Sequence, residues 1–250
     1  MIKWMAAAGM LLLVQCAGAQ EDKVVADRPS ETQTPQLTAP KYVQIEAGIR
    51  KEASGGDYTI FHPRTAVKYG LSKKVELRAE IDADSEKAFS KSEYKYGLLP
   101  VHLGFKAALL EGNGALPQTT FMGMAGMPTW ASHDNKAPHV APQLRLLMEN
   151  KWGEQWELDY NVGAEWDGNA TAPQWIATIE PQLTLNNKWQ LFVEAYGKWQ
   201  KGHGPEHVVD AGMGYFISKN LKLDVIAGKG LSHEAPEYFI STGLAFRFKM

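Results

Sequence analysis

The sequence predicts an all-β protein, specifically a transmembrane antiparallel up-and-down β-barrel of about twelve strands. Three observations predict it: an export signal at the N-terminus, period-two alternation of apolar and polar residues along most of the chain, and connections that are alternately short and long. Alternation places successive side chains on opposite faces of a strand. A strand of roughly ten residues with one apolar face is long enough to cross a bilayer when it is tilted.

The first 19 residues have the features of a bacterial secretory signal. Lys3 precedes an apolar run over residues 5–14, and Ala17-Gly18-Ala19 offers a cleavage site. The run is too short to span a membrane as a helix. Cleavage near Ala19 would remove Cys16, the only cysteine of the chain. Processing of Cys16 as a lipoprotein is the alternative, but Gln15 directly before it fits that site poorly.

Residues 20–40 are polar and interrupted by Pro29, Pro35 and Pro40, so no regular element is expected there. We expect either an extended periplasmic arm or a segment inside the lumen that plugs it. Asp27, Arg28 and Pro29 form a candidate N-terminal latch whose Arg would pair with lumenal carboxylates, and the alternative is a leader without contacts. The expected organisation is therefore a signal peptide at 1–19, an arm or plug at 20–40 and an outer-membrane barrel at 41–250.

The strand over residues 155–166 shows the pattern most clearly. Its even positions, from Trp156 to Trp166, are all apolar or aromatic, and its odd positions include Glu157, Asp159 and Glu165. One face could lie in lipid while the other lies in water. The same alternation, taken in chain order, predicts strands at 42–50, 59–70, 75–82, 101–107, 118–127, 143–149, 155–166, 174–183, 189–198, 209–215, 221–228 and 238–248.

The connections support a closed barrel with its N-terminus in the periplasm. Short turns at 71–74, 150–154, 186–188 and 217–220 alternate with longer loops at 83–96, 128–139, 167–172 and 200–206. The apolar faces of the strands carry no Asp, Glu, Lys or Arg, as lipid contact requires. A soluble β-sandwich is the alternative, but its strands would be nearer five or six residues. Aromatic girdles are expected from Tyr69, Trp156, Trp166, Trp175, Trp189, Tyr215 and Tyr238.

Several segments resemble a known bacterial family. They are the stretch from Asp27 to Thr32, residues 42–48, Tyr69-Gly70-Leu71, Val75-Glu76-Leu77-Arg78, Phe192-Val193-Glu194, Asp210-Ala211-Gly212 and residues 243–248. Together they are similar to the outer-membrane barrels grouped under the MetA pathway of phenol degradation. The resemblance implies a transporter-type barrel that passes small molecules, aromatic ones among them, and it brings no catalytic residues. One departure is that Phe248 is followed by Lys249 and Met250, which displaces the terminal aromatic residue typical of such barrels.

The polar faces supply the candidate site residues, which would line the lumen. They are Glu76, Arg78, Glu80, Glu157, Asp159, Glu180, Glu194, Asp210, Asp224 and Arg247. One interpretation is a water-filled path whose charges set selectivity. The other is a cross-strand salt-bridge network that fills the interior. We expect Glu76, Arg78 and Glu80 to line any constriction.

The leading functional hypothesis is an outer-membrane barrel through which small, aromatic or hydrophobic molecules pass. A closed structural or adhesin-type barrel is the alternative, and a lipid-modifying outer-membrane enzyme is less favoured. No serine is placed beside His102, and Gly204-Pro205 between His203 and His207 excludes a helical metal pair. We therefore expect no catalytic residue, metal or cofactor. Expected partners are outer-membrane lipid, the barrel-assembly machinery and a small-molecule solute. Nucleic acid is not an expected partner, because the net charge of −2 provides no excess of positive charge to bind it.

Overall fold

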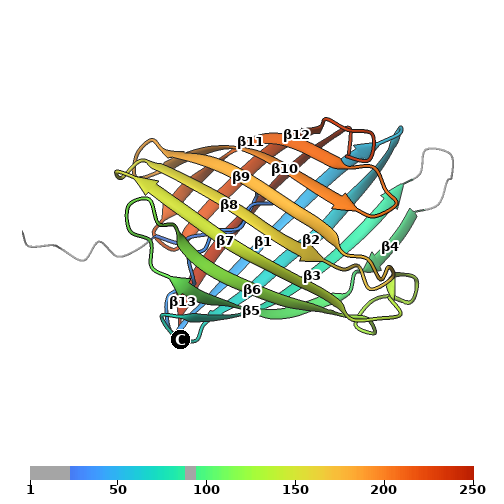
Figure 1. Cartoon of the computed structure of the whole chain (residues 1–250), viewed down its shortest axis with the longest axis horizontal. Helices are drawn as coiled ribbons and strands as arrows, with labels where there is room; N and C mark the ends of the chain where they lie inside the picture. Colours follow the sequence, from blue (N-terminus) through green and yellow to red (C-terminus); the bar gives the residue numbers. More distant parts are fainter. Residues whose placement is uncertain (1–22, 88–93) are drawn as a thin grey trace, which may run out of the picture.

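The computed structural model describes residues 23–87 and 94–250, so the expected signal peptide lies outside the described residues. Within them, strand segments form one antiparallel sheet that curves into a barrel (Figure 1). The segments are β1 (Tyr42–Ser54), β2 (Asp57–Gly70), β3 (Val75–Lys87), β4 (Tyr94–Leu98), β5 (Val101–Leu110), β6 (Gln118–Met127), β7 (Ala141–Trp152), β8 (Trp156–Glu165), β9 (Gln174–Thr184), β10 (Trp189–Gln200), β11 (Glu206–Ser218), β12 (Leu221–Gly230) and β13 (Tyr238–Lys249).

The sheet closes on itself, which confirms the predicted fold class. Apart from β4 and β5, each strand pairs with its neighbours in sequence, and β1 also pairs with β13. Both β4 and β5 pair with β3, one after the other along its length, so the thirteen segments occupy twelve strand positions. Closure joins the first strand to the last, as lipid requires, and of the described strands β4 alone pairs on one side only.

The predicted long loop at 83–96 is wrong at both ends, because β3 continues to Lys87 and β4 begins at Tyr94. Asp84 and Ser85 still pair with Gly97 and Tyr96. Alternation marks a strand only where lipid demands one apolar face, and the backbone ladder continues beyond that zone. Pro63 does not end the second strand. It lies within β2 at a register shift between Phe61 and Arg64, where the ladder with β3 is locally interrupted.

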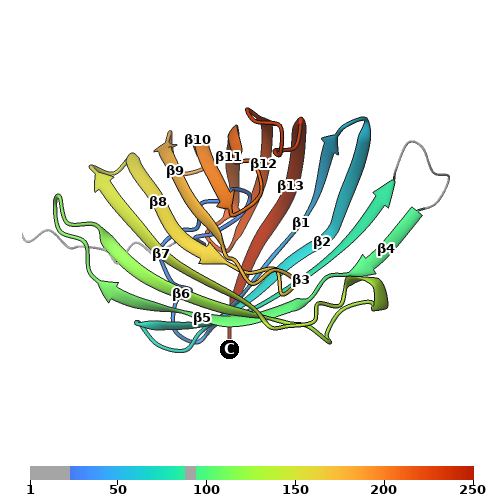
Figure 2. The ribbon, with the colours of Figure 1, turned by 45° about the vertical axis from the view of Figure 1, so that its right-hand side comes forward.

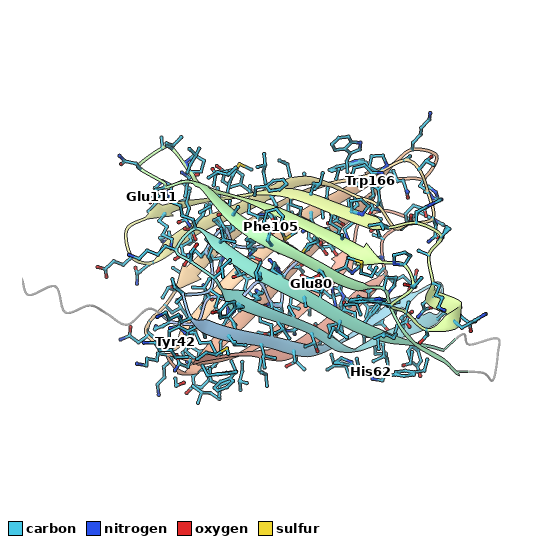
Figure 3. All side chains as sticks on the ribbon, turned by 90° about the horizontal axis from the view of Figure 1, so that it is seen from below. Tyr42, His62, Glu80, Phe105, Glu111 and Trp166 are labelled. Carbon is cyan, nitrogen blue, oxygen red and sulfur yellow. The ribbon has the colours of Figure 1, made fainter. Side chains whose placement is uncertain are left out.

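The two ends of the barrel differ as predicted in most of their connections. The connections after β2, β5, β7, β9 and β11 lie at the end that holds Tyr42 and the C-terminus, here called the short-turn end. The connections after β6, β8, β10 and β12 lie at the opposite, long-loop end, and the exception there is the short turn at 55–56 between β1 and β2. Figure 3 shows Tyr42 and Glu111 towards the first end and His62 and Trp166 towards the second.

The side chains sort by face as the alternation predicts. Many of the large hydrophobic residues that are exposed have side chains on the outward faces of the strands, such as Ile49, Leu77, Phe105, Val162 and Val193. Their inward neighbours are polar or charged and are nevertheless buried, which requires that something fills the lumen. Among the described residues, no helix is long and apolar enough to cross a membrane, and the one helical turn is a 3₁₀ segment at His133–Asn135.

Candidate functional site: a lumen filled by the N-terminal arm

Residues 23–40, hereafter the arm, lie inside the barrel. The blue segment that precedes β1 runs within the ring of strands in two different views (Figures 1 and 2). The backbone N–H of Val24 donates to the carbonyl of Lys219 in a turn at the short-turn end, and Pro40 forms a bridge with Gly70. Between these two points the arm extends into the lumen and returns, burying Asp27 and Thr32 on the way.

Three cations on neighbouring strands form what we call the cation socket: Lys68 on β2, Arg78 on β3 and Lys106 on β5. Lys68 and Arg78 are directly opposite each other in the β2–β3 ladder, and Lys106 is opposite Glu76 in the β3–β5 ladder. All three are almost fully buried. Like charges that face each other across a ladder destabilise the sheet, so the socket needs an anion.

The anion in the socket is the carboxylate of Asp27 from the arm. Lys106 Nζ lies 2.7 Å from its Oδ1, Arg78 Nη2 lies 3.0 Å from its Oδ2, and Lys68 Nζ contacts the same Oδ2. The backbone N–H of Thr34 also donates to Oδ1. Burial by itself would raise the pKa of Asp27, but the charges of Lys106, Lys68 and Arg78 hold it well below its usual range. Asp27 is therefore ionised and fixed by several charge-assisted bonds.

The next residue, Arg28, binds the wall formed by β12 and β13. Its Nη2 lies 3.0 Å from Asp224 Oδ1 and 3.3 Å from the hydroxyl of Ser241. Its guanidinium lies over Gly48 and Gly243, which face each other across the β1–β13 ladder. A Cβ built on Gly48 would collide with that guanidinium, so a glycine is required for this close approach.

Wall carboxylates accept hydrogen bonds from the backbone of the arm. Glu46 accepts from the N–H groups of Asp27 and Arg28, at 3.3 and 3.1 Å. Glu194 accepts from the N–H and hydroxyl of Thr32, both at 2.5 Å. Glu76 accepts from the N–H of Thr38 at 2.7 Å. These bonds satisfy the donors of a segment that has no regular structure of its own.

A second ionic contact fixes the middle of the arm. Glu31 lies 2.6 Å from Arg145 Nη2 on β7 and 3.5 Å from Lys198 Nζ on β10. Burial would raise the pKa of Glu31, but these two cations hold it below its usual range. Beside it, Asn161 on β8 exchanges two hydrogen bonds with the backbone of Gln33, at 2.7 and 2.8 Å. The arm is therefore bound to strands on both sides of the lumen.

The wall opposite the cation socket is acidic. Asp159 on β8 lies directly opposite Glu149 on β7 and Glu180 on β9, and Glu194 on β10 lies directly opposite Asp210 on β11. Several oxygens of this carboxylate row, including both of Asp210, have no hydrogen-bond partner in the structure. The cation socket on β2, β3 and β5 therefore lies opposite a row of carboxylates on β7 to β11, in which Arg145 and Lys198 are the cations that bind Glu31, and the arm lies between the two.

Two cavities remain on either side of the arm. A cavity of about 520 Å³ lies towards the short-turn end, and its walls include Glu157, Asp159 and Arg247. A smaller one of about 100 Å³ lies on the long-loop side and is lined by Asp27 and Arg78 among others. The arm separates the two, so removal of the arm would join them.

The structure places the sequence-predicted residues as follows. Arg78 contacts both Asp27 and Glu80, and Glu80 and Pro29 line the smaller cavity. Asp224 binds Arg28, and Glu76 accepts from the arm at Thr38. The remaining predicted residues lie in the carboxylate row or line the larger cavity: Asp159, Glu180, Glu194 and Asp210 in the row, and Glu157 and Arg247 at the cavity.

Sequence analysis left some functional residues out of the candidate site. Lys106 and Lys68 lie on the polar faces of their strands, but nothing in the sequence indicates that they bind the same carboxylate as Arg78. Asn161 lacks a charge, and nothing marks it as a partner of the arm. Gly48 does carry a signal, because a glycine inside a strand indicates a close approach of another group.

An apolar cluster lies inside the lumen. Phe192, Tyr196, Val208, Ile226 and Phe239 pack together with Ala235 on the inward side of β10 to β13. The guanidinium of Arg50 stacks on Phe239 at 3.7 Å from the ring centre. The alternation over residues 189–198 predicts that Phe192 and Tyr196 face inward, but it does not predict that they join apolar residues of other strands.

The histidines do not converge on a site. His102 lies opposite Glu80 and Gly126 within its strands, and His207 packs against Trp199. In residues 23–87 and 94–250, no group of three or more His, Cys, Asp or Glu side chains is placed to hold a metal ion.

Residues 26–248 match the family described as "Putative MetA-pathway of phenol degradation". The chain belongs to this family. The match covers the arm from Ala26 onward as well as the barrel, so the arm is part of the family's common sequence. No curated protein sequence matches the chain.

Solved structures with the same fold are outer-membrane barrels. The COG4313 outer membrane channel from Pseudomonas putida F1 has a TM-score of 0.65 at 11% identity and covers 88% of this chain and 99% of its own. The KdgM porin in complex with disordered oligogalacturonate has a TM-score of 0.54 at 9% identity, covering 83% and 99%. The P. putida toluene transporter TodX has a TM-score of 0.50 at 10% identity, covering 85% and 80%. At these identities the likeness concerns the fold.

Proposed function

We propose that this protein is an outer-membrane channel for small molecules whose lumen is closed by its own N-terminal arm. In this proposal the chain is exported by its signal peptide, cleaved near Ala19, and folded by the barrel-assembly machinery into outer-membrane lipid. The short-turn end faces the periplasm, and the arm enters the lumen from that side. Asp27, Arg28 and Pro29 act as the latch.

The observation that carries the proposal is the set of contacts that hold the arm. Ionic and hydrogen-bonding contacts fix its middle part, with Asp27 in the cation socket and Arg28 on Asp224, while Val24 is buried near the short-turn end. Polar contacts can be exchanged for water, whereas an apolar plug would have to expose its core to leave. The arm is also a terminal segment, so it can be withdrawn without breaking any strand pair of the barrel.

The family and the inner surface of the barrel both support a small aromatic solute. The family description refers to phenol degradation, and one structure of the same fold is named as a toluene transporter. The apolar cluster around Phe192 and Phe239 offers an aromatic surface next to the charged wall. A small aromatic molecule with a polar substituent would find partners on both.

The test is the ionic current of the refolded protein in a planar bilayer. We compare the mature chain with a variant that lacks residues 20–40, after both have shown heat-modifiable barrel folding on a gel. The proposal predicts discrete openings that are more frequent without the arm. It also predicts that Glu76→Gln and Arg78→Gln change the cation-to-anion selectivity in opposite directions, since they remove opposite charges from the lumen.

A closed structural barrel is the second candidate, and the density of ion pairs across the lumen favours it. If both folded forms stay silent in the bilayer, this candidate is supported and the channel is refuted. A channel is also favoured over an enzyme, because the named structures of the same fold are channels, porins and transporters.

A further inference from the structure

The cation socket has a property that the arm reveals: it binds a carboxylate. Asp27 supplies both oxygens to it, Oδ1 to Lys106 and Oδ2 to Lys68 and Arg78. The aspartate side chain, its Cβ included, is chemically a tethered acetate. The geometry points to the cation socket as a binding site for a carboxylate-bearing solute, which the arm occupies in the closed state.

The socket is built on the wall and does not depend on the arm for its position. Its cations stand on three adjacent strands in fixed register, and each is at most 4% exposed. Two of them have wall carboxylates beside them, Glu46 at Lys68 and Glu80 at Arg78. Lys106 contacts Asp27 and the carbonyl of Thr34, both of which belong to the arm. Withdrawal of the arm therefore leaves Lys106 in particular without these acceptors.

The second argument is access. The 100 Å³ cavity on the long-loop side is lined by both Asp27 and Arg78, so it reaches the edge of the socket while the arm is still in place. A carboxylate that enters from this side passes Arg64, Glu80 and Asp82, which line the same cavity, before it reaches Arg78. It can then replace Asp27 on Lys106 and Lys68 as the arm moves away towards the short-turn end.

The chemistry favours a carboxylate over a neutral solute of the same shape. An amide in place of the carboxylate would present an NH₂ group to cations that only donate hydrogen bonds. It would also leave the charge of Lys106 without an anionic acceptor, whereas Lys68 and Arg78 keep Glu46 and Glu80 beside them. The socket thus selects for a monoanion with two oxygens on one carbon, and the solute class is a small organic carboxylate.

This inference rests on the proposed function only in that the arm leaves the lumen. Competition with the arm costs the solute affinity, because a tethered carboxylate has an effective concentration on the order of millimolar or above. We therefore expect weak binding to the intact protein and stronger binding once the tethered carboxylate is removed.

The experiment is chemical rescue of Asp27→Ala in the full mature chain. This substitution deletes the carboxylate group but keeps Cβ, and the 100 Å³ cavity beside residue 27 has room for the methyl group of an acetate ion that binds in its place. We measure the midpoint of thermal unfolding as sodium acetate is added, with acetamide as the neutral analogue and sodium chloride at equal ionic strength for screening. Asp167→Ala, which alters an exposed loop residue between β8 and β9, is the matched control.

The expected result is a saturable rise of the midpoint for Asp27→Ala with acetate that exceeds the change with either control compound. Asp167→Ala and the unmodified protein should show no such excess. Adding Lys106→Gln to Asp27→Ala should abolish the rescue. Equal effects of acetate and chloride on Asp27→Ala would overturn the site, whatever the bilayer current shows.

A second measurement covers the case in which Asp27→Ala does not fold. Ser30→Cys, in a mature chain without other thiols, reports exposure of the arm through its rate of reaction with a charged thiol reagent. Acetate should raise that rate above the rate in equal concentrations of acetamide or chloride. An unchanged rate at saturating acetate would contradict displacement of the arm by a carboxylate.

Discussion

The substitution Asp27→Asn tests the latch with the smallest change of shape. The amide keeps an oxygen that can accept from the N–H of Thr34 but loses the charge that binds Lys68, Arg78 and Lys106. Removing one partner of a buried ion pair costs about 3–5 kcal/mol. In the open state the lumen is filled with water and the socket is hydrated, so this cost falls mainly on the closed state.

That free energy converts directly into a change of gating. At 1.4 kcal/mol for each factor of ten, the ratio of open to closed channels should rise roughly 100- to 4000-fold in Asp27→Asn. The assay is the open probability of single channels in a planar bilayer, with Asp167→Asn in the external loop as the matched control. An open probability equal to that of the unmodified protein would refute the role of Asp27 as a latch.

Three further predictions concern other contacts of the arm. Gly48→Val should displace the Arg28 guanidinium and raise the open probability while the barrel still folds, because the clash is with that flexible side chain alone; loss of heat-modifiable folding would contradict this. Asn161→Ala should raise the open-to-closed ratio about tenfold, since it removes two hydrogen bonds to Gln33 worth roughly 0.5–1.5 kcal/mol each, and an unchanged ratio would argue against it. Acid should open the channel, because the pKa values of Asp27 and Glu31 are lowered in the closed state. Their contribution to the stability of the closed state is present above about pH 4 and is lost as the pH falls further. A pH titration of the current would test this.

The barrel was predictable because lipid imposes a rule on every strand. A charge at mid-membrane on the lipid face costs roughly 2–4 kcal/mol, so residues such as Leu77 and Val162 alternate with polar ones wherever the sheet crosses. The rule ends where the strand leaves lipid, which is why the alternation predicts neither the last five residues of β3 nor the start of the short β4. It also says nothing of an inward apolar side chain such as Phe239.

The contacts of the arm were less predictable for a different physical reason. Asp27 and Arg28 stood out as charges beside a proline, but their partners come from β2, β3, β5 and β12, which only the closed ladder brings together. The meeting of Lys68, Arg78 and Lys106 depends on strand register. Register is set by the turns and by the phase of the alternation, and one residue of slip would point each cation at lipid.

The most direct measurement of the central claim, that the arm closes the lumen from the periplasmic side, uses the arm as a separate peptide. A synthetic peptide of residues 23–40 is added to a bilayer that contains the barrel without its arm. We predict that the peptide blocks the current from the short-turn side, and that the same peptide with Asp27→Asn blocks it much more weakly. Equal block by both peptides, or no block from that side, would contradict the claim.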